Sequence, residues 1–258
     1  MGERVDGLRL AVTTLTVAPV RGPAVLDRLT ASWAMRFAPL VGLALAAVLA
    51  TLVAAVDLLT VGPPLLACAL ALAAHALLTR GLHLDGLADV ADGLGSYASP
   101  ERAREVMKQP DVGALGLATV VLTLGVQLAA LQACLLAGRG TTAVVLAVVT
   151  ARVAVTAACT TGVPAAVPTG LGALVAGTVP RGWALGLAVL TAALGTGLAA
   201  AQDTTLWLPV LAVAAGLGSA RLLRDHVVRR IGGVTGDVLG ALVETTTAVV
   251  LVVLALSP

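Results

Sequence analysis

The chain has 258 residues, of which 59% are hydrophobic and only 12% are charged. A soluble domain carries about 25% charged residues, so this composition excludes an ordinary soluble domain and indicates an integral membrane protein. A net charge of +2 and an aromatic content of 2% exclude a nucleic-acid-binding protein, which needs a basic surface and rings that stack on bases.

Seven runs with at most one charged residue each approach the length of about 20 helical residues that crosses a bilayer core. They predict an all-α, polytopic membrane protein with about seven transmembrane helices. The hydrophilic parts are too short to form a separate soluble domain, so we expect a single membrane-embedded domain over residues 1–258. The predicted spans are residues 37–56, 62–79, 113–137, 141–161, 182–201, 206–220 and 238–256.

The basic residues concentrate in alternate connections. Those before the first and fifth spans and after the second and sixth hold nearly all of them, whereas the other connections hold only Arg139 among basic residues. Because basic connections face the cytoplasm, this asymmetry predicts a cytoplasmic N-terminus. It also predicts two cytoplasmic loops, an Asp-rich one at residues 81–116 and a second at residues 221–237.

Three carboxylates crowd together in the first of these loops. Asp85, Asp89 and Asp92 follow at i, i+4 and i+7, which puts them on one stripe of a helix over about residues 85–92. Like charges at this spacing destabilise a helix unless a cation neutralises them. Over about 10 Å, the three groups could hold one Mg²⁺ or two, with phosphate oxygens and water as further ligands. The alternative is a solvated acidic face.

Three further residues of this loop are weaker candidates. His83 lies two residues before Asp85, so on a continuous helix it would point away from the acidic stripe. It can serve as a general base or phosphate donor only if the helix begins after it; otherwise it is an interfacial histidine. Farther along, Ser99 is expected to cap a short solvated helix, after which Lys108 and Asp111 are the better candidates for ligand contacts.

A second constellation leads into the last span. Thr235 is expected to cap that helix, with Asp237 near its positive end. Glu244 shares the face of Asp237 about 10 Å deeper, where a carboxylate is either functional or hydrogen-bonded between helices. The backbone N–H groups of Gly232 and Gly233 either meet a phosphate or form a simple turn.

Arg152 stands near the middle of the fourth predicted span. A guanidinium at that depth should pair with a carboxylate or face a polar cavity. Two interpretations stay open at this point: a structural pair with Glu244, or binding of a phosphate. His75 and His226 have no polar constellation around them in the sequence and are interpreted as structural.

The chain resembles the adenosylcobinamide-GDP ribazoletransferase family, also called cobalamin synthase, in ordered blocks over nearly its whole length. The main blocks are GLHLDGLADVADGLGS at 81–96, VMKQPDVGALG at 106–116 and GGVTGDVLGALVE at 232–244; weaker matches are LTVAPV at 15–20, FAPLVG at 37–42 and TARVAV at 150–155. Two departures are Arg80-Gly81, where the family often has Gly-Gly, and Gln109, where it often has Asp. A metal role for this second block therefore depends on Asp111.

The resemblance implies a Mg²⁺-dependent, multi-pass transferase of a prokaryotic inner membrane that acts late in cobalamin biosynthesis. Such an enzyme joins adenosylcobinamide-GDP to α-ribazole, or its 5′-phosphate, and releases GMP by phosphoryl transfer. We expect its active site to face the cytoplasm, with Asp85, Asp89 and Asp92 holding the metal and one of them, or His83, taking a proton. Its partners would be these small molecules and the bilayer, with either homo-oligomers or other cobalamin-pathway enzymes as further partners.

Two rival functions are less consistent with the sequence. CDP-alcohol phosphotransferases of phospholipid synthesis carry a motif similar to D-x-x-D-G-x-x-A-R, but here Ser96 and Tyr97 stand where Ala and Arg should be. An ion-coupled secondary transporter would use Arg152 and Glu244 as a relay. Transporters favour internal repeats and midplane carboxylates, whereas no repeat is visible here and most carboxylates lie in the predicted loops.

Overall fold

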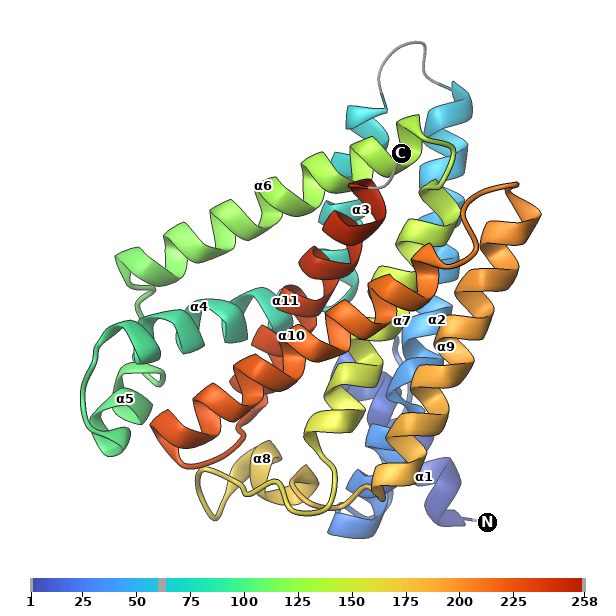
Figure 1. Cartoon of the computed structure of the whole chain (residues 1–258). Helices are drawn as coiled ribbons and strands as arrows, with labels where there is room; N and C mark the ends of the chain where they lie inside the picture. The colour runs from blue at the N-terminus through green and yellow to red at the C-terminus, as the bar shows by residue number, and fades with distance from the viewer. Residues whose placement is uncertain (1, 60–63, 257–258) are drawn as a thin grey trace.

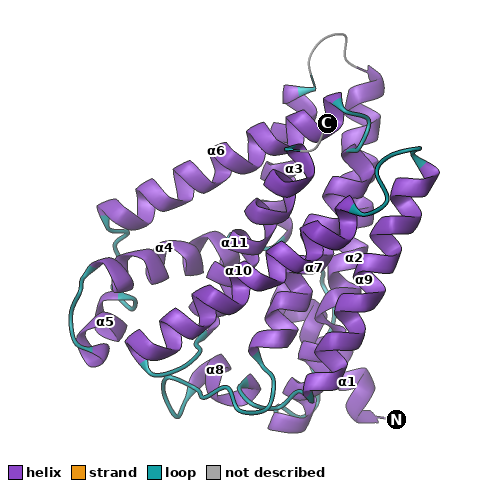
Figure 2. Ribbon diagram, in the orientation of Figure 1, coloured by secondary structure: helices purple, strands orange, loops and turns teal. Residues whose placement is uncertain are grey.

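The computed structural model describes residues 2–59 and 64–256, and every regular element within them is a helix (Figures 1 and 2). The predicted all-α class is therefore confirmed. The helices are α1 (Gly2–Leu15), α2 (Arg28–Leu59), α3 (Leu65–Leu78), α4 (Leu82–Gly95), α5 (Pro100–Val106), α6 (Ala114–Leu136), α7 (Gly140–Ala158), α8 (Gly170–Val175), α9 (Arg181–Ala201), α10 (Leu208–Ile231) and α11 (Gly236–Ala255).

Five of the described helices are long and apolar enough to cross a membrane: α2, α6, α7, α9 and α11. A sixth crossing is present only if α3 and α4, which are bent by 86° relative to each other, together form one broken span. The predicted total of seven spans is thus not confirmed, and the side of the N-terminus stays a prediction. Residues 62–63, at the start of the predicted second span, lie outside the described residues.

The predicted sixth span and second loop belong to one helix. α10 begins near the predicted start of that span but continues to Ile231, so most of the loop predicted at residues 221–237 is helical. Arg221, Arg224 and Asp225 lie in this C-terminal part, and α10 is not among the helices that qualify as spans. α10 does not end at Arg221, because the segment from there to Ile231 holds no glycine or proline that would stop a helix.

α7 forms the centre of the bundle. It packs against α2, α9, α10 and α11, and nearly all of its side chains are buried. Most of these side chains are Ala, Val or Thr, whose small volumes allow neighbouring helices to approach closely. In Figure 1, α2, α7 and α9 run side by side, whereas α4, α6 and α10 extend to one side of them. This side arm carries the acidic stripe.

A left-handed turn directs α4 away from α3. Arg80 and Gly81 have φ angles of +58° and +67°, and the Gly81 N–H donates to the Ala76 carbonyl at 2.7 Å. Arg80 is a non-glycine residue in this unfavourable region. Its guanidinium Nη2 donates to the Thr13 carbonyl at 3.1 Å, which ties the turn to α1. The bend lays α4 against α11 and α6.

Helix caps that the sequence predicted are present. The Ser99 and Thr235 hydroxyls accept hydrogen bonds from backbone N–H groups of α5 and α11, as expected. At the start of α2, Asp27 Oδ1 accepts from the Thr30 N–H at 2.8 Å. The hydrogen bonds from Thr30 hold the pKa of Asp27 below its ordinary value. These caps fix where α5, α11 and α2 begin.

Candidate active site

The acidic stripe of α4 is held beside the start of α11 by a close helix crossing. A Cβ atom added to Gly86 would lie 2.5 Å from the Asp237 carbonyl oxygen. On the other helix, a Cβ added to Gly240 would lie 3.2 Å from the His83 Cα atom. Only glycine permits the two backbones to approach this closely. The crossing therefore brings Asp237, from the far end of the sequence, to the acidic residues of α4.

Four carboxylates and one lysine share this region. The negative charges of Asp85, Asp237 and Asp92 all act on the Asp89 carboxyl, and Lys108 acts on Asp237 with the opposite sign. The Thr235 hydroxyl also donates to Asp237 Oδ2 at 3.2 Å. The structure thus unites the acidic stripe with three residues that the sequence predicted separately. Four acids against two bases, Lys108 and the Arg80 that lines a cavity with Asp85, still leave an excess of negative charge, which favours a bound cation.

Asp92 differs from the other three acids because both of its oxygens are engaged. Oδ2 accepts from the Gly113 N–H and Oδ1 from the Gly116 N–H, each at 2.8 Å. These N–H groups belong to the start of α6, so Asp92 caps that helix from 21 residues away and interacts with its positive end. No sequence pattern predicts this contact, because it joins residues that lie far apart along the chain.

The donor set of these carboxylates suits Mg²⁺. Within residues 2–59 and 64–256, no three His, Cys, Asp or Glu side chains surround one point closely enough to hold an ion alone. Mg²⁺ does not need such a cage, because it is usually bound by one or two carboxylates with substrate phosphates and water as the other ligands. The side-chain carboxylates of Asp85 and Asp89 accept no hydrogen bond from the described residues, so their oxygens are free for that role.

Two cavities adjoin the stripe along α4. One, of about 550 Å³, is lined by Arg80 and Asp85 together with apolar residues of α4 and α6. The other, of about 330 Å³, is lined by Asp92, Gln109 and Asp111. Asp111 therefore lies on the Asp92 side of the stripe. These spaces give ligands access to both ends of the acidic stripe.

His83 points away from the stripe, because α4 begins at Leu82 and includes it. Its side chain is only 2% exposed, and both ring nitrogens are buried without a hydrogen bond. The ring lies 6.2 Å from that of His75, centroid to centroid. The condition under which His83 would face the acidic residues, a helix beginning after it, is not met.

Arg152 is fully buried and contacts a histidine. Its Nη2 atom lies 3.1 Å from His75 Nε2, whereas Glu244 Oε2 accepts from Gln127 Nε2 at 2.8 Å. Among the described residues, Arg152 and Glu244 form no ion pair within 4.0 Å, although their charges act on each other. His75 and Gln127 are partners that the sequence analysis missed. The available signal was that each is a polar side chain inside an apolar run.

Gly232 and Gly233 have backbone roles. Gly232 has a φ of +93° and ends α10, while Arg104 Nη1 donates to the preceding Ile231 carbonyl at 2.6 Å. A Cβ on Gly233 would lie 2.3 Å from the Ala165 carbonyl carbon. Of the two predicted interpretations, the geometry favours the turn, which joins α10 to the capped start of α11.

A sequence model of a known family, described as cobalamin-5-phosphate synthase, matches residues 7–255. Three similar curated proteins are each named adenosylcobinamide-GDP ribazoletransferase. The protein of Frankia casuarinae is 43% identical over 96% of this chain and 94% of its own length. That of Corynebacterium efficiens is 38% identical (96% and 90%), and that of Nocardioides sp. 41% (95% and 96%). No solved structure matches the chain.

Proposed function

The chain belongs to the cobalamin-5-phosphate synthase family, and from that premise we propose that it joins adenosylcobinamide-GDP to α-ribazole, or to its 5′-phosphate. The products are adenosylcobalamin, or its 5′-phosphate, and GMP. The observation that carries the site assignment is the meeting of Asp237 with the acidic stripe of α4 through the Gly86 crossing.

The reaction exchanges one phosphorus–oxygen bond for another. The ribose hydroxyl oxygen forms a bond to the phosphorus attached to cobinamide, while the bond from that phosphorus to the oxygen of the GMP phosphate breaks. GMP leaves with the bonding electron pair, and the hydroxyl loses its proton. In phosphoryl transfer of this kind, catalysis depends mainly on positioning and on neutralising negative charge.

We propose that the carboxylates of α4 are the ligands of Mg²⁺. Asp85 and Asp89 would bind the ion, and Asp92 retains lone pairs beyond the two that accept backbone N–H groups. Held there, Mg²⁺ would supply positive charge to neutralise the diphosphate and the GMP leaving group. Asp237 adds a fourth carboxylate, while Lys108 supplies a positive charge of the protein's own beside it.

The proton of the attacking hydroxyl passes to a carboxylate of this group. Asp85 and Asp89 are the proposed acceptors, because Asp92 already accepts two hydrogen bonds. His83 is not proposed for this step, since its ring is buried on the other side of the helix. A general base must lie within hydrogen-bond reach of the proton that it removes.

The protein is a multi-pass membrane protein, and we propose that its reaction site faces the cytoplasm of a prokaryotic cell. The support is the distribution of basic residues, which predicts that the connection after α3 and the turn after α10 lie on the same, cytoplasmic side. Both adenosylcobinamide-GDP and α-ribazole are polar, so access from the aqueous side through the cavities along α4 is consistent with this orientation.

A condensation assay tests the proposed function. Purified protein is mixed with adenosylcobinamide-GDP and α-ribazole, or its phosphate, with Mg²⁺ or with excess chelator, and the corrinoid product and GMP are measured by chromatography. We expect equal amounts of both products with Mg²⁺ and loss of both in chelator, with recovery when Mg²⁺ is restored. Absence of corrinoid product from folded protein contradicts the reaction, whereas full activity in chelator contradicts the metal assignment alone.

A further inference from the structure

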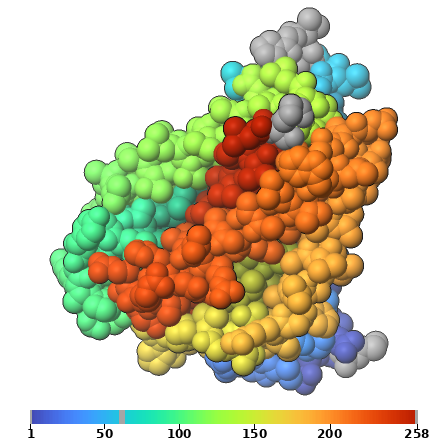
Figure 3. Space-filling model, in the orientation of Figure 1, coloured from blue at the N-terminus to red at the C-terminus, as the bar shows by residue number. Residues whose placement is uncertain are grey.

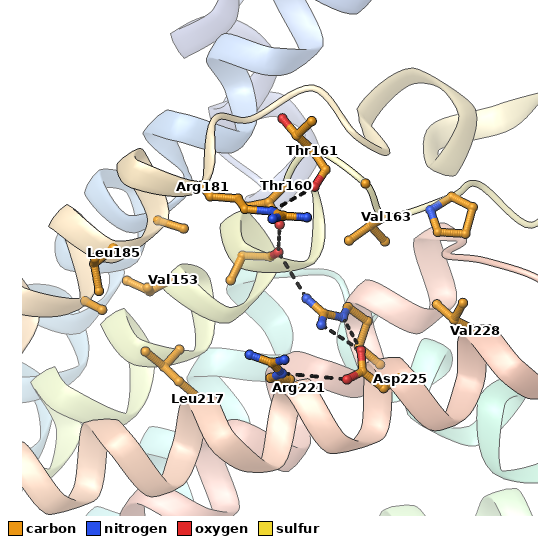
Figure 4. Close-up of a pocket in the computed structure, with 16 residues that line it drawn as sticks. Val153, Thr160, Thr161, Val163, Arg181, Leu185, Leu217, Arg221, Asp225 and Val228 are labelled. Carbon is orange, nitrogen blue, oxygen red and sulfur yellow. Dashed lines mark hydrogen bonds and ion pairs between the residues drawn. The ribbon is translucent and has the colours of Figure 1, made fainter.

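A pocket of about 590 Å³ lies between α7, α9 and α10, away from the acidic stripe (Figure 4). Its polar lining includes Arg181, Arg221, Arg224 and Asp225. Three guanidinium groups against one carboxylate leave the lining with an excess of positive charge. Such a lining favours an anionic ligand.

Two of the three arginines have donors to spare. Arg224 is engaged, since its Nε and Nη2 atoms donate to Asp225 Oδ1 at 2.9 and 2.6 Å. Arg181, by contrast, uses only its Nε atom, which donates to the Thr161 carbonyl at 3.2 Å. Its two terminal nitrogens donate to no other described residue. Arg221 has a 76% exposed side chain and only a 3.7 Å contact to Asp225. Their terminal nitrogens can therefore bind a phosphate without breaking an existing hydrogen bond.

The pocket lies where two membrane-spanning helices end. Arg181 is the first residue of α9, and Thr161 follows closely after the end of α7 at Ala158, so the polar residues lie at one end of both spans. The pocket continues along the spans between apolar side chains. Val153, Leu185 and Leu217 gather to one side of the arginines in Figure 4. A polar opening above apolar walls matches the boundary between lipid headgroups and acyl chains.

α10 separates this pocket from the acidic stripe. Arg221, Arg224, Asp225 and Val228 line the pocket, whereas His226 and Arg230, on the opposite face of α10, line a cavity beside α4. α9 and α10 form the outer surface on this side of the molecule (Figure 3). A phosphate bound by Arg181 and Arg221 therefore belongs to a ligand other than the one at the acidic stripe.

We propose that this pocket binds the phosphate of an anionic phospholipid, with the guanidinium groups on the headgroup and an acyl chain along α7, α9 and α10. Basic pockets between membrane helices bind such headgroups by this combination. The exposure of Leu185 on α9 supports a lipid rather than a water-soluble phosphate ester, because an apolar wall that reaches the lipid-facing surface suits an acyl chain. The site is independent of the proposed reaction.

Lipid retention tests the proposal. Full-length protein and its Arg181→Gln/Arg221→Gln variant are reconstituted in nanodiscs with equal amounts of phosphatidylglycerol and phosphatidylcholine, then extracted in detergent. Bound lipids are counted by native mass spectrometry. Arg21→Gln/Arg229→Gln removes the same charge outside the pocket and is the matched control. In a second arm, ribose 5-phosphate is added as a phosphate ester without an acyl chain.

We expect the unmodified protein and the control to retain phosphatidylglycerol in preference to phosphatidylcholine. The preference of the pocket variant should fall roughly 25-fold, at about fivefold for each of the two arginines near the lipid surface. Ribose 5-phosphate should leave retention unchanged. Equal retention by the pocket and control variants overturns the proposal, as does pocket-dependent binding of ribose 5-phosphate with no lipid preference. Thermal unfolding in detergent shows whether each variant is folded. Arg221→Gln alone changes an exposed side chain, so it tests the same lipid preference with less risk to the fold.

Discussion

The crossing of α4 and α11 at Gly86 offers a sharp test of the site geometry. In Gly86→Ala, the new methyl group would meet the Asp237 carbonyl oxygen at 2.5 Å and its Cα atom at 2.9 Å. Carbon atoms in van der Waals contact are about 3.5–4.0 Å apart, so the two backbones must separate by roughly 1 Å. Overpacking of this kind costs about 1–3 kcal/mol of stability.

The same displacement moves the acidic stripe of α4 relative to Asp237. Because a misplacement of about 1 Å lowers enzymatic rates by about 10²-fold, we expect Gly86→Ala to lose about that factor in kcat. Turnover is measured by GMP release, and stability by thermal unfolding in detergent. The expected result is a large loss of activity in a protein that is still folded.

Two other glycines provide a graded comparison. Gly240→Ala places its methyl 3.2 Å from the His83 backbone and should have an intermediate effect. Gly218→Ala meets no atom within 4 Å; it should keep full activity and gain about 0.5–1 kcal/mol from higher helix propensity. If Gly86→Ala instead matches Gly218→Ala in activity and stability, the close crossing of α4 and α11 does not position the site.

Two stability predictions follow from buried and capping contacts. Asp92→Ala removes the acceptors of the Gly113 and Gly116 N–H groups and should cost about 1–2 kcal/mol; no change would mean that α6 does not need this cap. Glu244→Leu removes the side-chain acceptor of the Gln127 amide, which then keeps only the backbone carbonyl of residue 244 at 3.3 Å, and should cost about 1 kcal/mol; an unchanged or higher unfolding temperature would contradict that role. Both are measured by thermal unfolding of purified protein in detergent.

Local features of the site were predictable from the sequence. The spacing of Asp85, Asp89 and Asp92 defines a helical stripe wherever the segment is helical, and α4 is helical over all three. Thr235 was likewise predicted as the cap of the last helix, because a hydroxyl before an apolar run satisfies N–H groups only a few residues away. The stripe and the cap each join residues that are close in sequence, so helical periodicity and capping preferences are enough to predict them.

Relations between distant segments were not predictable in the same way. The 86° bend between α3 and α4 depends on left-handed conformations at both Gly81, where glycine allows one, and Arg80, a residue whose type does not signal it. The sequence also could not identify the partner of Arg152, because that depends on which faces of α3 and α11 pack nearest to it. The structure pairs it with His75. The Asp92 cap on α6 could not be predicted either, because it depends on how α4 packs against the start of α6.

The carboxylates of α4 are proposed to carry the reaction, a claim that can be tested by the turnover of Asp89→Asn. Turnover is compared with that of the unmodified protein over a range of Mg²⁺ concentrations, with Asp57→Asn as a control acid outside the site. We predict a loss of about 10²-fold or more in kcat for Asp89→Asn, unfolding behaviour like that of the unmodified protein, and normal turnover for Asp57→Asn. Near-normal turnover of Asp89→Asn with unchanged Mg²⁺ dependence would contradict the claim.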